Sequence, residues 1–555
     1  MEFADLIKVP RVESVTLHRY HMAPVEGTLC ITGHHLILSS RLMAKEELWL
    51  LHRNVDTVEK KLTGPSGVLL LKCKDFQVIQ LDIPAAEDCL KLAASIEQLS
   101  NIDNVNLFYP FFYRPMFDIM EDGWQAFLPE VEFNQLKKSL GADWRISQVN
   151  RDFAVCSTYP QLVVVPKSVD DETITQAACF RQSGRFPVLS YHHKANGMVM
   201  LRSSQPLTGP NGKRCREDEK LVNAVLGIGR RGYIIDTRSL TQAKLATAKG
   251  GGVEPEVHYP QWRRIHQQIE RYNVLHESIV KLIEVSVDGN IGMDKWLSKL
   301  EASGWLTHVK DSLTCACVAA QCIDKEGASV LVHGADGMDT TIIVTSLAQV
   351  IINPDCRTVR GFEALVEREW LQGGHPFGDR CVKSAFATSK NHQESPVFLL
   401  FLDCVWQIWR QFPCSFEFNE DFLLTLFRHA YASQFGTFLG NSDMERTKLQ
   451  LKDKTVSLWS YINRPEVLQQ YLNSLYEPHN SVIWPSVAPQ SLELWSSMYQ
   501  KWQRSHVAEE EICMEISNIK EYDKELKSKV IRLRKHLVSL EREAVDLGLI
   551  PVPAQ

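Results

Sequence analysis

The most regular hydrophobic pattern lies near the C-terminus, where apolar residues repeat every seven positions. A second apolar series falls four residues after members of the first, which is the a/d spacing of a coiled-coil seam, with Asp523 at a polar a position. The alternative is a single helix packed on the protein's own body, but polar flanks and the length of the repeat favour a coiled coil over residues 506–547. The predicted interface residues are Ile512, Ile516, Ile519, Leu526, Val530, Leu533, Leu537, Leu540 and Leu547.

Charges beside this seam bear on the partner. In a parallel pair of copies Lys529 would face Arg534, and Asp523 would face itself, both unfavourably. Glu515 opposite Lys520 and His536 opposite Glu541 would be compatible. The pattern therefore favours a different chain as partner, with a homodimer as the alternative.

The first hundred residues alternate short apolar runs with turn signals. Residues 28–32 and 35–38 are separated by a Gly-containing turn, which predicts a hairpin, and further strands are expected over residues 47–51, 68–73 and 76–81. Residues 85–99 then show helical spacing of apolar side chains. Strands closed by a C-terminal helix are typical of a pleckstrin-homology fold, which we expect over residues 1–100.

The remaining chain divides into four segments. A linker over residues 101–122 contains the aromatic run 108–113, interpreted as packing between domains. Residues 123–500 mix short strands and helices, as an α/β domain does. The coiled coil follows at 506–547 and a tail at 548–555. The predicted fold class is therefore multidomain, α+β and α/β.

One segment of the α/β part suggests chemistry. Residues 328–332 predict a strand and residues 341–351 a helix, joined by a Gly-containing loop. Cysteine-dependent phosphatases place a His-Cys-x5-Arg loop between such elements, but here Gly334 stands at the cysteine position and Thr340 at the arginine position. The predicted degenerate loop comprises His333, Gly334, Ala335, Asp336, Gly337, Met338, Asp339, Thr340 and Thr341.

These two replacements remove the groups that the phosphatase reaction needs. The thiolate attacks phosphorus to form a covalent intermediate, and the arginine clamps two phosphate oxygens as charge develops. Gly334 has no side chain, and Thr340 is neutral and too short to fork around a phosphate. The sequence therefore predicts no catalytic residues in this loop.

The loop is similar to the myotubularin signature His-Cys-Ser-Asp-Gly-Trp-Asp-Arg-Thr, with matches at His333, Asp336, Gly337, Asp339 and Thr341. Residues 26–29 with 48–49 resemble the family's GRAM domain. Further segments that resemble the family are 144–147, 202–206, 361–371, 401–407, 416–419 and 435–438.

This resemblance implies an inactive member of the myotubularin family. Active members remove the 3-phosphate of phosphatidylinositol 3-phosphate and phosphatidylinositol 3,5-bisphosphate. The implied role is a pseudophosphatase that binds an active relative, from the subgroup of myotubularin-related proteins 6, 7 and 8, through its coiled coil. It would change that partner's stability, activity and membrane targeting. The alternative is a phosphoinositide-binding adaptor without an enzyme partner.

Three further features of the sequence could indicate a functional site. The resemblance gives the Asp339 position to a general acid, but without a nucleophile we expect Asp339 to cap the following helix. Arg202 and Arg238 could contact an anion, although structural ion pairs are favoured. Residues 227–232 match a dinucleotide pattern, but a helix precedes them and a strand follows, so a helix stop and turn is expected.

Composition narrows the classes of function that the chain could have. The chain has 555 residues and a net charge of −6, which argues against general nucleic-acid binding. Its 14 cysteines form no Cys-x-x-Cys pair, so neither a structural metal nor a cofactor is indicated. No apolar run approaches the ~20 residues of a membrane span. We expect a cytoplasmic protein peripherally associated with endomembranes.

Overall fold

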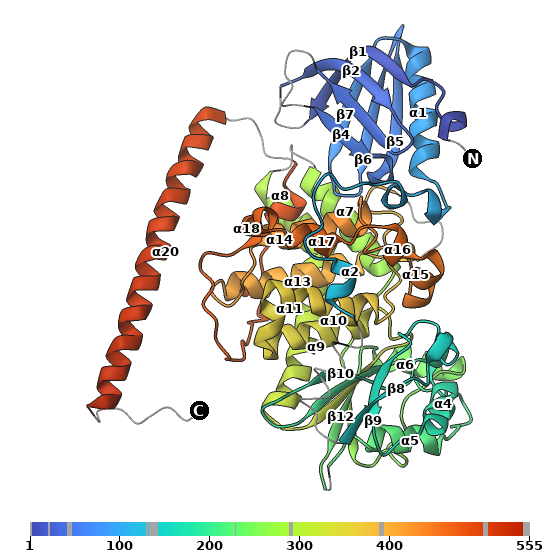
Figure 1. The fold of residues 1–555 in the computed structure, drawn as a ribbon, viewed down its shortest axis with the longest axis vertical. Coiled ribbons are helices and arrows are strands. Elements are labelled where there is room, and N and C mark those ends of the chain that lie inside the picture. The colour runs from blue at the N-terminus through green and yellow to red at the C-terminus, as the bar shows by residue number, and fades with distance from the viewer. Residues whose placement is uncertain are drawn as a thin grey trace.

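The fold is described from a computed structural model covering residues 3–19, 23–40, 47–128, 131, 143–227, 229–287, 292–387, 393–502 and 509–547. An N-terminal sheet with helix α1 (Ala86–Ser100) stands at one end of a helical body, and a second sheet stands at the other. Helix α20 (Glu509–Asp546) lies beside the body (Figure 1). The predicted multidomain α+β and α/β fold class is confirmed.

The N-terminal sheet has seven antiparallel strands in the order β4-β3-β2-β1-β7-β6-β5. Along β6 and β7 every second side chain is buried, following the two-residue period of a strand. The expected hairpin is formed by β2 and β3. The strands are β1 (Arg11–Arg19), β2 (Val25–Ile31), β3 (His35–Ser39), β4 (Leu48–Leu51), β5 (Val55–Thr63), β6 (Ser66–Cys73) and β7 (Val78–Ile83).

The second sheet has five strands in the order β10-β11-β14-β12-β13, parallel except for β10 at the edge. The carboxyl ends of β11, β14 and β12 meet at one edge, where such sheets hold their functional residues. The strands are β10 (Val188–His192), β11 (Val199–Ser203), β12 (Gly232–Asp236), β13 (Trp262–His266) and β14 (Ser329–His333), with β8 (Trp144–Ser147) and β9 (Val163–Pro166) forming a separate pair.

The helical body is built around α10 (Thr340–Ile352), in which every residue is buried. It packs between α9 (Trp305–Asp324) and α13 (Val397–Gln411), whose apolar faces complete the core. The other helices are α2 (Gly123–Ala126), α4 (Asp171–Cys179), α5 (Arg216–Asn223), α6 (Leu240–Ala248), α7 (Asn273–Val287), α8 (Met293–Ser303), α11 (Val359–Leu365), α12 (Phe377–Arg380), α14 (Glu420–Tyr431), α15 (Asp443–Leu449), α16 (Leu451–Lys454), α17 (Leu458–Ile462), α18 (Pro465–Tyr471) and α19 (Ser496–Tyr499). Helix α5 and strand β12 flank residues 227–232, in the order expected for a helix stop and turn.

A deeply inserted side chain of the N-terminal sheet helps to join it to the body. Phe76, in the turn between β6 and β7, is 2% exposed and packs against Phe427 and Tyr499 of the body at ring distances of 5.5 and 6.2 Å. Trp502 donates its indole N–H to the carbonyl of Asp75 in the same turn (3.1 Å). The turn therefore fixes the sheet to the point where the chain leaves the body.

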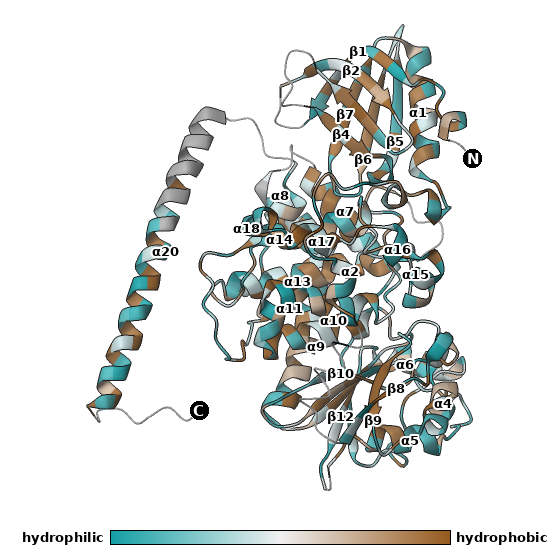
Figure 2. Cartoon of the chain, in the orientation of Figure 1, coloured by the Kyte–Doolittle hydropathy of each residue, from teal (hydrophilic) through white to brown (hydrophobic). Residues whose placement is uncertain are grey.

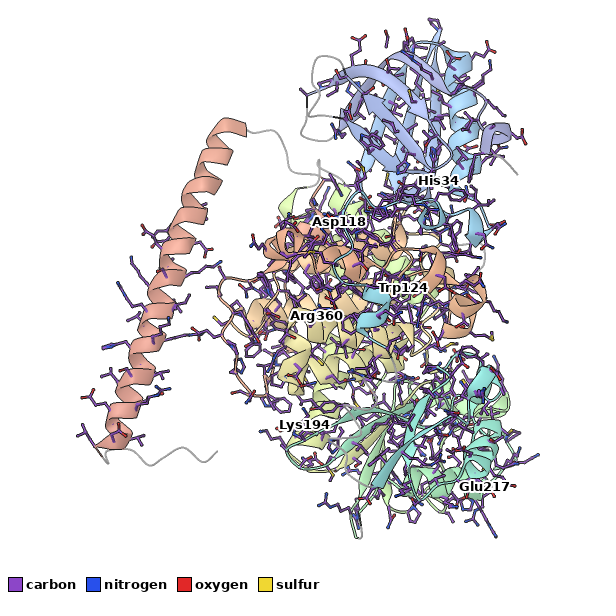
Figure 3. The ribbon with its side chains drawn as sticks, in the orientation of Figure 1. His34, Asp118, Trp124, Lys194, Glu217 and Arg360 are labelled. Atoms are coloured by element: carbon purple, nitrogen blue, oxygen red, sulfur yellow. The ribbon has the colours of Figure 1, made fainter. Side chains whose placement is uncertain are left out.

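The aromatic run 108–113 also packs between the two parts, as expected. Phe108 lies under the guanidinium of Arg53 from the N-terminal part (3.8 Å), and Tyr113 packs against Phe435 of the body (5.6 Å). Trp124, labelled in Figure 3, continues this anchoring by donating its indole N–H to the carbonyl of Thr455 (2.9 Å).

Helix α20 exposes its apolar residues to solvent. Figure 2 shows hydrophobic and hydrophilic residues alternating along its described part. Arg534 lies 3.3 Å from Glu477 of the body. Within the described part of the chain, no helix is both long and apolar enough to span a membrane.

Candidate functional site

The predicted loop lies at the carboxyl edge of the second sheet. His333 ends β14, residues 334–338 form the turn, Asp339 stands at the N-cap position, and Thr340 and Thr341 begin α10. The strand and helix thus lie where the hydrophobic pattern predicts them. The helix N-terminus with its unpaired N–H groups points into the loop, which is the geometry that holds anions in many α/β proteins.

Hydroxyl groups fill the space beside Gly334. The Oγ1 atoms of Thr237 and Thr340 lie 2.7 Å apart in a buried hydrogen bond. A Cβ atom added to Gly334 would stand 2.6 Å from Thr237 Oγ1 and 3.1 Å from Thr340 Oγ1. The volume that a side chain at position 334 would need is therefore already occupied by the side chain of Thr237.

A buried ion-pair network supports the loop from below. His333 Nε2 lies 3.0 Å from Glu254 Oε2, and Glu254 also pairs with Arg181 (2.6 Å). Arg181 in turn makes a bidentate pair with Asp218. Burial alone would raise the pKa of Glu254, but the neighbouring His333 and Arg181 outweigh it and hold that pKa far below its ordinary value.

A second arginine holds the backbone of the turn. Arg185 is fully buried and donates to the carbonyls of Gly337 (2.7 Å) and Gly373 (2.9 Å). Gly337 has a φ of +74°, and a Cβ there would meet the carbonyl oxygen of Ser203 at 2.5 Å. Only glycine fits both this backbone conformation and this close approach. The carbonyl of Ala335 accepts the Gln205 N–H at 3.1 Å.

Asp339 does not cap α10, so the capping expectation is wrong. Its side chain makes no capping hydrogen bond and is instead paired with Arg380, whose Nη2 lies 2.8 Å away, and with His375 Nδ1 (3.1 Å). Burial alone would raise the pKa of Asp339, but Arg380 and His375 hold it well below its ordinary value. Because a buried carboxylate is stabilised more by the paired guanidinium of Arg380 and the adjacent His375 ring than by backbone N–H groups alone, the side chain turns away from the helix start. The Nδ1 atom of His375 also lies 3.0 Å from the Met338 carbonyl.

Asp336 braces the loop from the outside. Its Oδ2 atom accepts hydrogen bonds from Arg271 (3.1 Å) and from the hydroxyl of Tyr272 (3.0 Å). The Tyr272 ring lies beneath the guanidinium of Arg380 as well (4.9 Å). The segment before α7 and the segment around α12 are therefore joined across the loop.

The two other candidate arginines form structural ion pairs, as favoured from sequence. Arg238 makes a bidentate pair with Asp236 and donates to the carbonyl of Gly252, the last of three consecutive glycines at 250–252. Arg202 lies 3.4 Å from Glu369. The arginines near the loop that are engaged by carboxylates or carbonyls in this way are Arg181, Arg185, Arg202, Arg238, Arg271 and Arg380.

The side chains from other segments that contact the loop could not be found from the loop motif alone. Thr237, Glu254 and Arg380 are distant from it in sequence and come from three different segments. A partial signal is the Asp236-Thr237-Arg238 triplet, which follows an apolar strand whose end meets that of β14.

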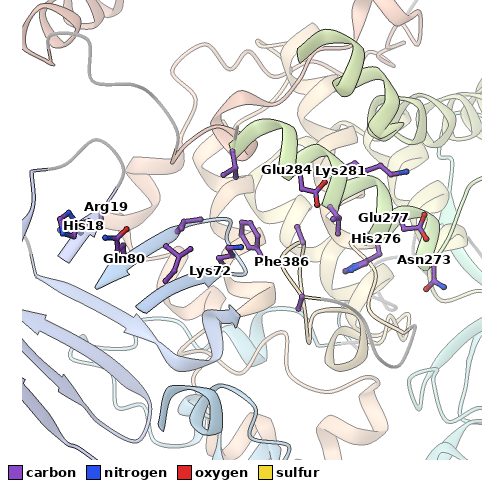
Figure 4. Close-up of a pocket in the computed structure, with 16 residues that line it drawn as sticks. His18, Arg19, Lys72, Gln80, Asn273, His276, Glu277, Lys281, Glu284 and Phe386 are labelled. Atoms are coloured by element: carbon purple, nitrogen blue, oxygen red, sulfur yellow. The ribbon is translucent and has the colours of Figure 1, made fainter. Parts of the chain in front are cut away.

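A cavity of about 1190 Å³ lies away from the loop, between the N-terminal sheet and α7 (Figure 4). Side chains on one face of α7 line it, including Glu277, Lys281 and Glu284, opposite Lys72 and Gln80 of the sheet. His276, on the same helix, also lines this cleft and is 9% exposed.

The predicted coiled-coil residues lie on α20. The exposed fraction of the apolar side chains along the seam is 42% at Leu526 and Val530 and 64% at Leu533. The others described, also exposed, are Ile519, Leu537, Leu540 and Leu547. The side chains of Ile512 and Ile516 lie outside the described residues.

Comparison with known proteins gives two family matches. The Myotubularin-like phosphatase domain matches residues 108–447, and the MTMR6-9, GRAM domain matches residues 8–100. The proteins named Myotubularin-related protein 9 in Mus musculus and Homo sapiens are each 62% identical over 543 residues, covering 98% of this chain and 99% of the relative. Phosphatidylinositol-3,5-bisphosphate 3-phosphatase MTMR6 of Homo sapiens is 35% identical over 558 residues, covering 98% of this chain and 88% of the relative.

Proposed function

The chain belongs to the myotubularin family, and from this premise we propose that it is a pseudophosphatase acting as a regulatory subunit of an active family member. The loop that carries catalysis in cysteine-dependent phosphatases has no nucleophile at Gly334 and no anion clamp at Thr340. Losing one oxyanion-stabilising donor alone typically costs ~10²–10³ in rate, and here the nucleophile is absent as well.

The observation that carries the regulatory part is the exposed seam of α20. Large apolar side chains that are half exposed along a helix are costly to leave in water and mark an interaction surface. Their a/d spacing is that of a two-stranded coiled coil. A body without catalytic groups that presents such a helix is suited to bind another protein rather than to turn over a substrate.

The partner class follows from the relatives. An active myotubularin phosphoinositide 3-phosphatase, of the subgroup that includes the relative MTMR6, is the partner that we propose. A subunit that binds only the folded enzyme stabilises it by mass action. A second GRAM-type domain would raise the effective concentration of the pair at a membrane. The proposed site of action is the cytoplasmic face of endomembranes.

The test is phosphate release from vesicles containing phosphatidylinositol 3-phosphate by a purified active family member. The intact chain, a chain truncated after Trp502, and a seam variant with Leu526, Leu533 and Leu540 changed to Ala are titrated into the enzyme. We expect only the intact chain to raise the rate, and the chain alone to release no phosphate. Val538→Ala is the matched control, because this exposed residue lies on the opposite side of α20 from the seam.

The same experiment judges the alternative of a stand-alone phosphoinositide adaptor. That function would need the degenerate loop to hold a headgroup, yet Arg185, Arg238 and Arg380 beside it are already hydrogen-bonded within the protein. The space beside Gly334 is also filled by Thr237. Unchanged enzyme rates with every chain, together with binding of the intact chain to vesicles, would favour the adaptor.

A further inference from the structure

The N-terminal sheet and the body meet at a groove that lies away from the degenerate loop. This is the cavity of about 1190 Å³ between the sheet and α7, shown in Figure 4. We call it the junction groove, because one wall belongs to the sheet and the other to the body. Its walls include Leu70, Lys72 and Val78 of the sheet and Glu277, Val280 and Glu284 of α7.

One stripe of α7 faces the junction groove. Asn273, Glu277, Val280, Glu284 and Val287 recur at intervals of three or four residues, which places them on one side of the helix. The opposite side of α7 is buried in the core of the body. The groove side therefore combines apolar side chains with charged ones, as the rim and floor of a protein interface do.

The charged side chains of this stripe have no partner in the described part of the chain. Glu277 and Glu284 are exposed, and neither makes an ion pair or a hydrogen bond with a described residue. Lys281, one turn after Glu277, is exposed and equally unpaired. Along α7 the order is therefore acidic, basic, acidic, and the two carboxylates are seven residues, or about 10 Å, apart along the helix axis.

The basic side chains on the opposite wall are already engaged. Lys72 Nζ lies 2.6 Å from Glu59, and His18 Nε2 lies 2.8 Å from Asp82. Arg19, the third basic residue of this wall, is engaged within the protein as well. An anionic lipid headgroup would have to displace these partners, so the charges of the groove do not favour an anion.

The size of the groove and the sheet topology favour a helix as the occupant. The volume exceeds the ~300–1,000 Å³ of small-molecule sites. A cylinder of this volume with the ~10 Å diameter of a helix is about 15 Å long, which corresponds to about three helical turns. An extended segment gains main-chain hydrogen bonds only at a sheet edge, but β1, β7 and β6 each have a neighbouring strand on both sides.

From these features we propose that the junction groove binds an amphipathic helix of a partner protein that carries two basic residues seven positions apart. These residues face Glu277 and Glu284, and an acidic residue between them faces Lys281. The charge order reads the same in both directions, so the partner helix can run either way. Its apolar side packs on Val280 and Val287. The inference goes beyond the proposed function, because it concerns neither the degenerate loop nor the seam of α20.

A helix in this position touches both sides of the domain junction. Leu70 and Val78 belong to the N-terminal sheet, whereas Val280 and Val287 belong to the body. A ligand that binds only the assembled junction stabilises it by mass action. Occupancy of the groove therefore holds the sheet against the body, in addition to the anchor formed by Phe76.

The test measures binding of synthetic helical peptides to the intact chain by fluorescence anisotropy. The peptides have about 14 residues, or four turns, and share one leucine face. The first carries Lys at two flanking positions seven apart with Glu between them, and the second carries Glu at those positions with Lys between. Because three exposed contacts change from unlike to like charge, we expect the first peptide to bind on the order of 10-fold more tightly at low salt. This preference should shrink as salt is raised.

Charge variants locate the bound peptide. Glu277→Lys/Glu284→Lys should reverse the peptide preference. The matched control is Asp294→Lys/Glu301→Lys, because these exposed acidic residues are also seven apart, on the neighbouring α8 and outside the groove. The control should keep the wild-type preference. Equal reversal by both variants, or no reversal by the first, would overturn the inference.

Apolar variants separate the groove from other exposed apolar surface. Val280→Ala/Val287→Ala should weaken the first peptide about 10-fold through lost apolar burial. Val274→Ala, at a 45% exposed site of α7 outside the groove, should leave binding unchanged. The triple alanine variant of the α20 seam should also bind as the wild type does. Loss of binding in that seam variant alone would place the peptide on α20 and overturn the assignment to the groove.

Two further measurements test the junction and the class of occupant. At a peptide concentration ten times its Kd, proteolysis between the sheet and the body should slow about 10-fold in the wild type and remain unchanged in Glu277→Lys/Glu284→Lys. Equal slowing in both proteins would overturn the coupling to the junction. Binding of phosphatidylserine vesicles that is lost in Val280→Ala/Val287→Ala would make the occupant a lipid and overturn the choice of a helix.

Discussion

The filled space beside Gly334 makes a quantitative prediction about restoring a side chain there. In Gly334→Cys the new Cβ would stand 2.6 Å from Thr237 Oγ1, well inside the 3.4 Å at which ordinary contact begins. Thr237 must rotate, which breaks its hydrogen bond to Thr340 (2.7 Å). Overpacking costs about 1–3 kcal/mol and stranded buried hydroxyls a similar amount, so we expect a loss of about 2–4 kcal/mol.

Removing Thr237's hydroxyl should relieve this loss. Thr237→Ala alone should cost about 1 kcal/mol through the lost hydrogen bond. The double variant Thr237→Ala/Gly334→Cys should then be about 2 kcal/mol more stable than the sum of the single changes predicts. The measurement is the shift in urea midpoint of the full chain for all four members of the cycle, converted with a common slope.

Thr341 provides the control for this cycle. Its Oγ1 lies 3.5 Å from the same Cβ position, which is ordinary contact, so Thr341→Ala should couple to Gly334→Cys by less than about 0.5 kcal/mol. Equal coupling at both threonines, or none at Thr237, would refute the reasoning. For catalysis, Thr237→Ala added to Gly334→Cys/Thr340→Arg should raise phosphate release on the order of 10-fold, because it frees the position of the thiol.

Three further predictions concern the scaffold. Phe76→Ala should cost about 3–5 kcal/mol and speed proteolysis between the N-terminal sheet and the body, whereas Phe112→Ala, at a 47% exposed site, should not; equal cleavage rates would contradict the anchoring role. Asp339→Ala should cost about 3–5 kcal/mol because it leaves Arg380 buried and unpaired, and a loss near 1 kcal/mol in thermal or urea unfolding would restore the capping role. Burial raises the pKa of Glu363 to about 8, compared with about 4.3 in the unfolded chain. The stability that the protonated side chain gives is therefore fully present below about pH 4.3 and is lost as the pH rises through about 8. Between pH 6 and 8 the wild type should therefore lose about 2–3 kcal/mol relative to Glu363→Gln, and parallel pH profiles of the two proteins would contradict this.

The sequence predicts the strands and helices whose hydrophobic pattern can be read from their own residues. Strands β2 and β3 and helix α10 follow from local apolar patterns. Strand β5 does not, because its outer half is exposed and charged, so the alternation that marks a half-buried strand is missing. Strand β1 is equally hidden, since a register shift between Val12 and Val15 interrupts its alternation.

The candidate site also has features that the sequence predicts and features that it does not. The absence of side chains able to attack or clamp a phosphate at Gly334 and Thr340 follows from two positions of a motif. The role of Asp339 does not, because its partners Arg380 and His375 lie beyond the far end of α10 in sequence and reach it only through tertiary packing. The capping prediction for Asp339 used only neighbouring residues. The buried ion pair with Arg380 replaces that role, and no local sequence pattern encodes it.

The scaffold around the loop explains how the fold tolerates the loss of its reactive residues. The interactions that hold the loop are made by His333, Arg185 and Asp339. Gly334 adds its carbonyl, 3.2 Å from His333 Nδ1, and Thr340 adds the hydroxyl that bonds to Thr237. With Gly334 and Thr340 at the cysteine and arginine positions, this buried site holds neither an ionisable thiol nor an arginine from the loop, and the hydroxyls of Thr237 and Thr340 bond to each other there. The apolar side chains of the α20 seam are exposed, which costs free energy in water, and under the proposed function another helix would cover them.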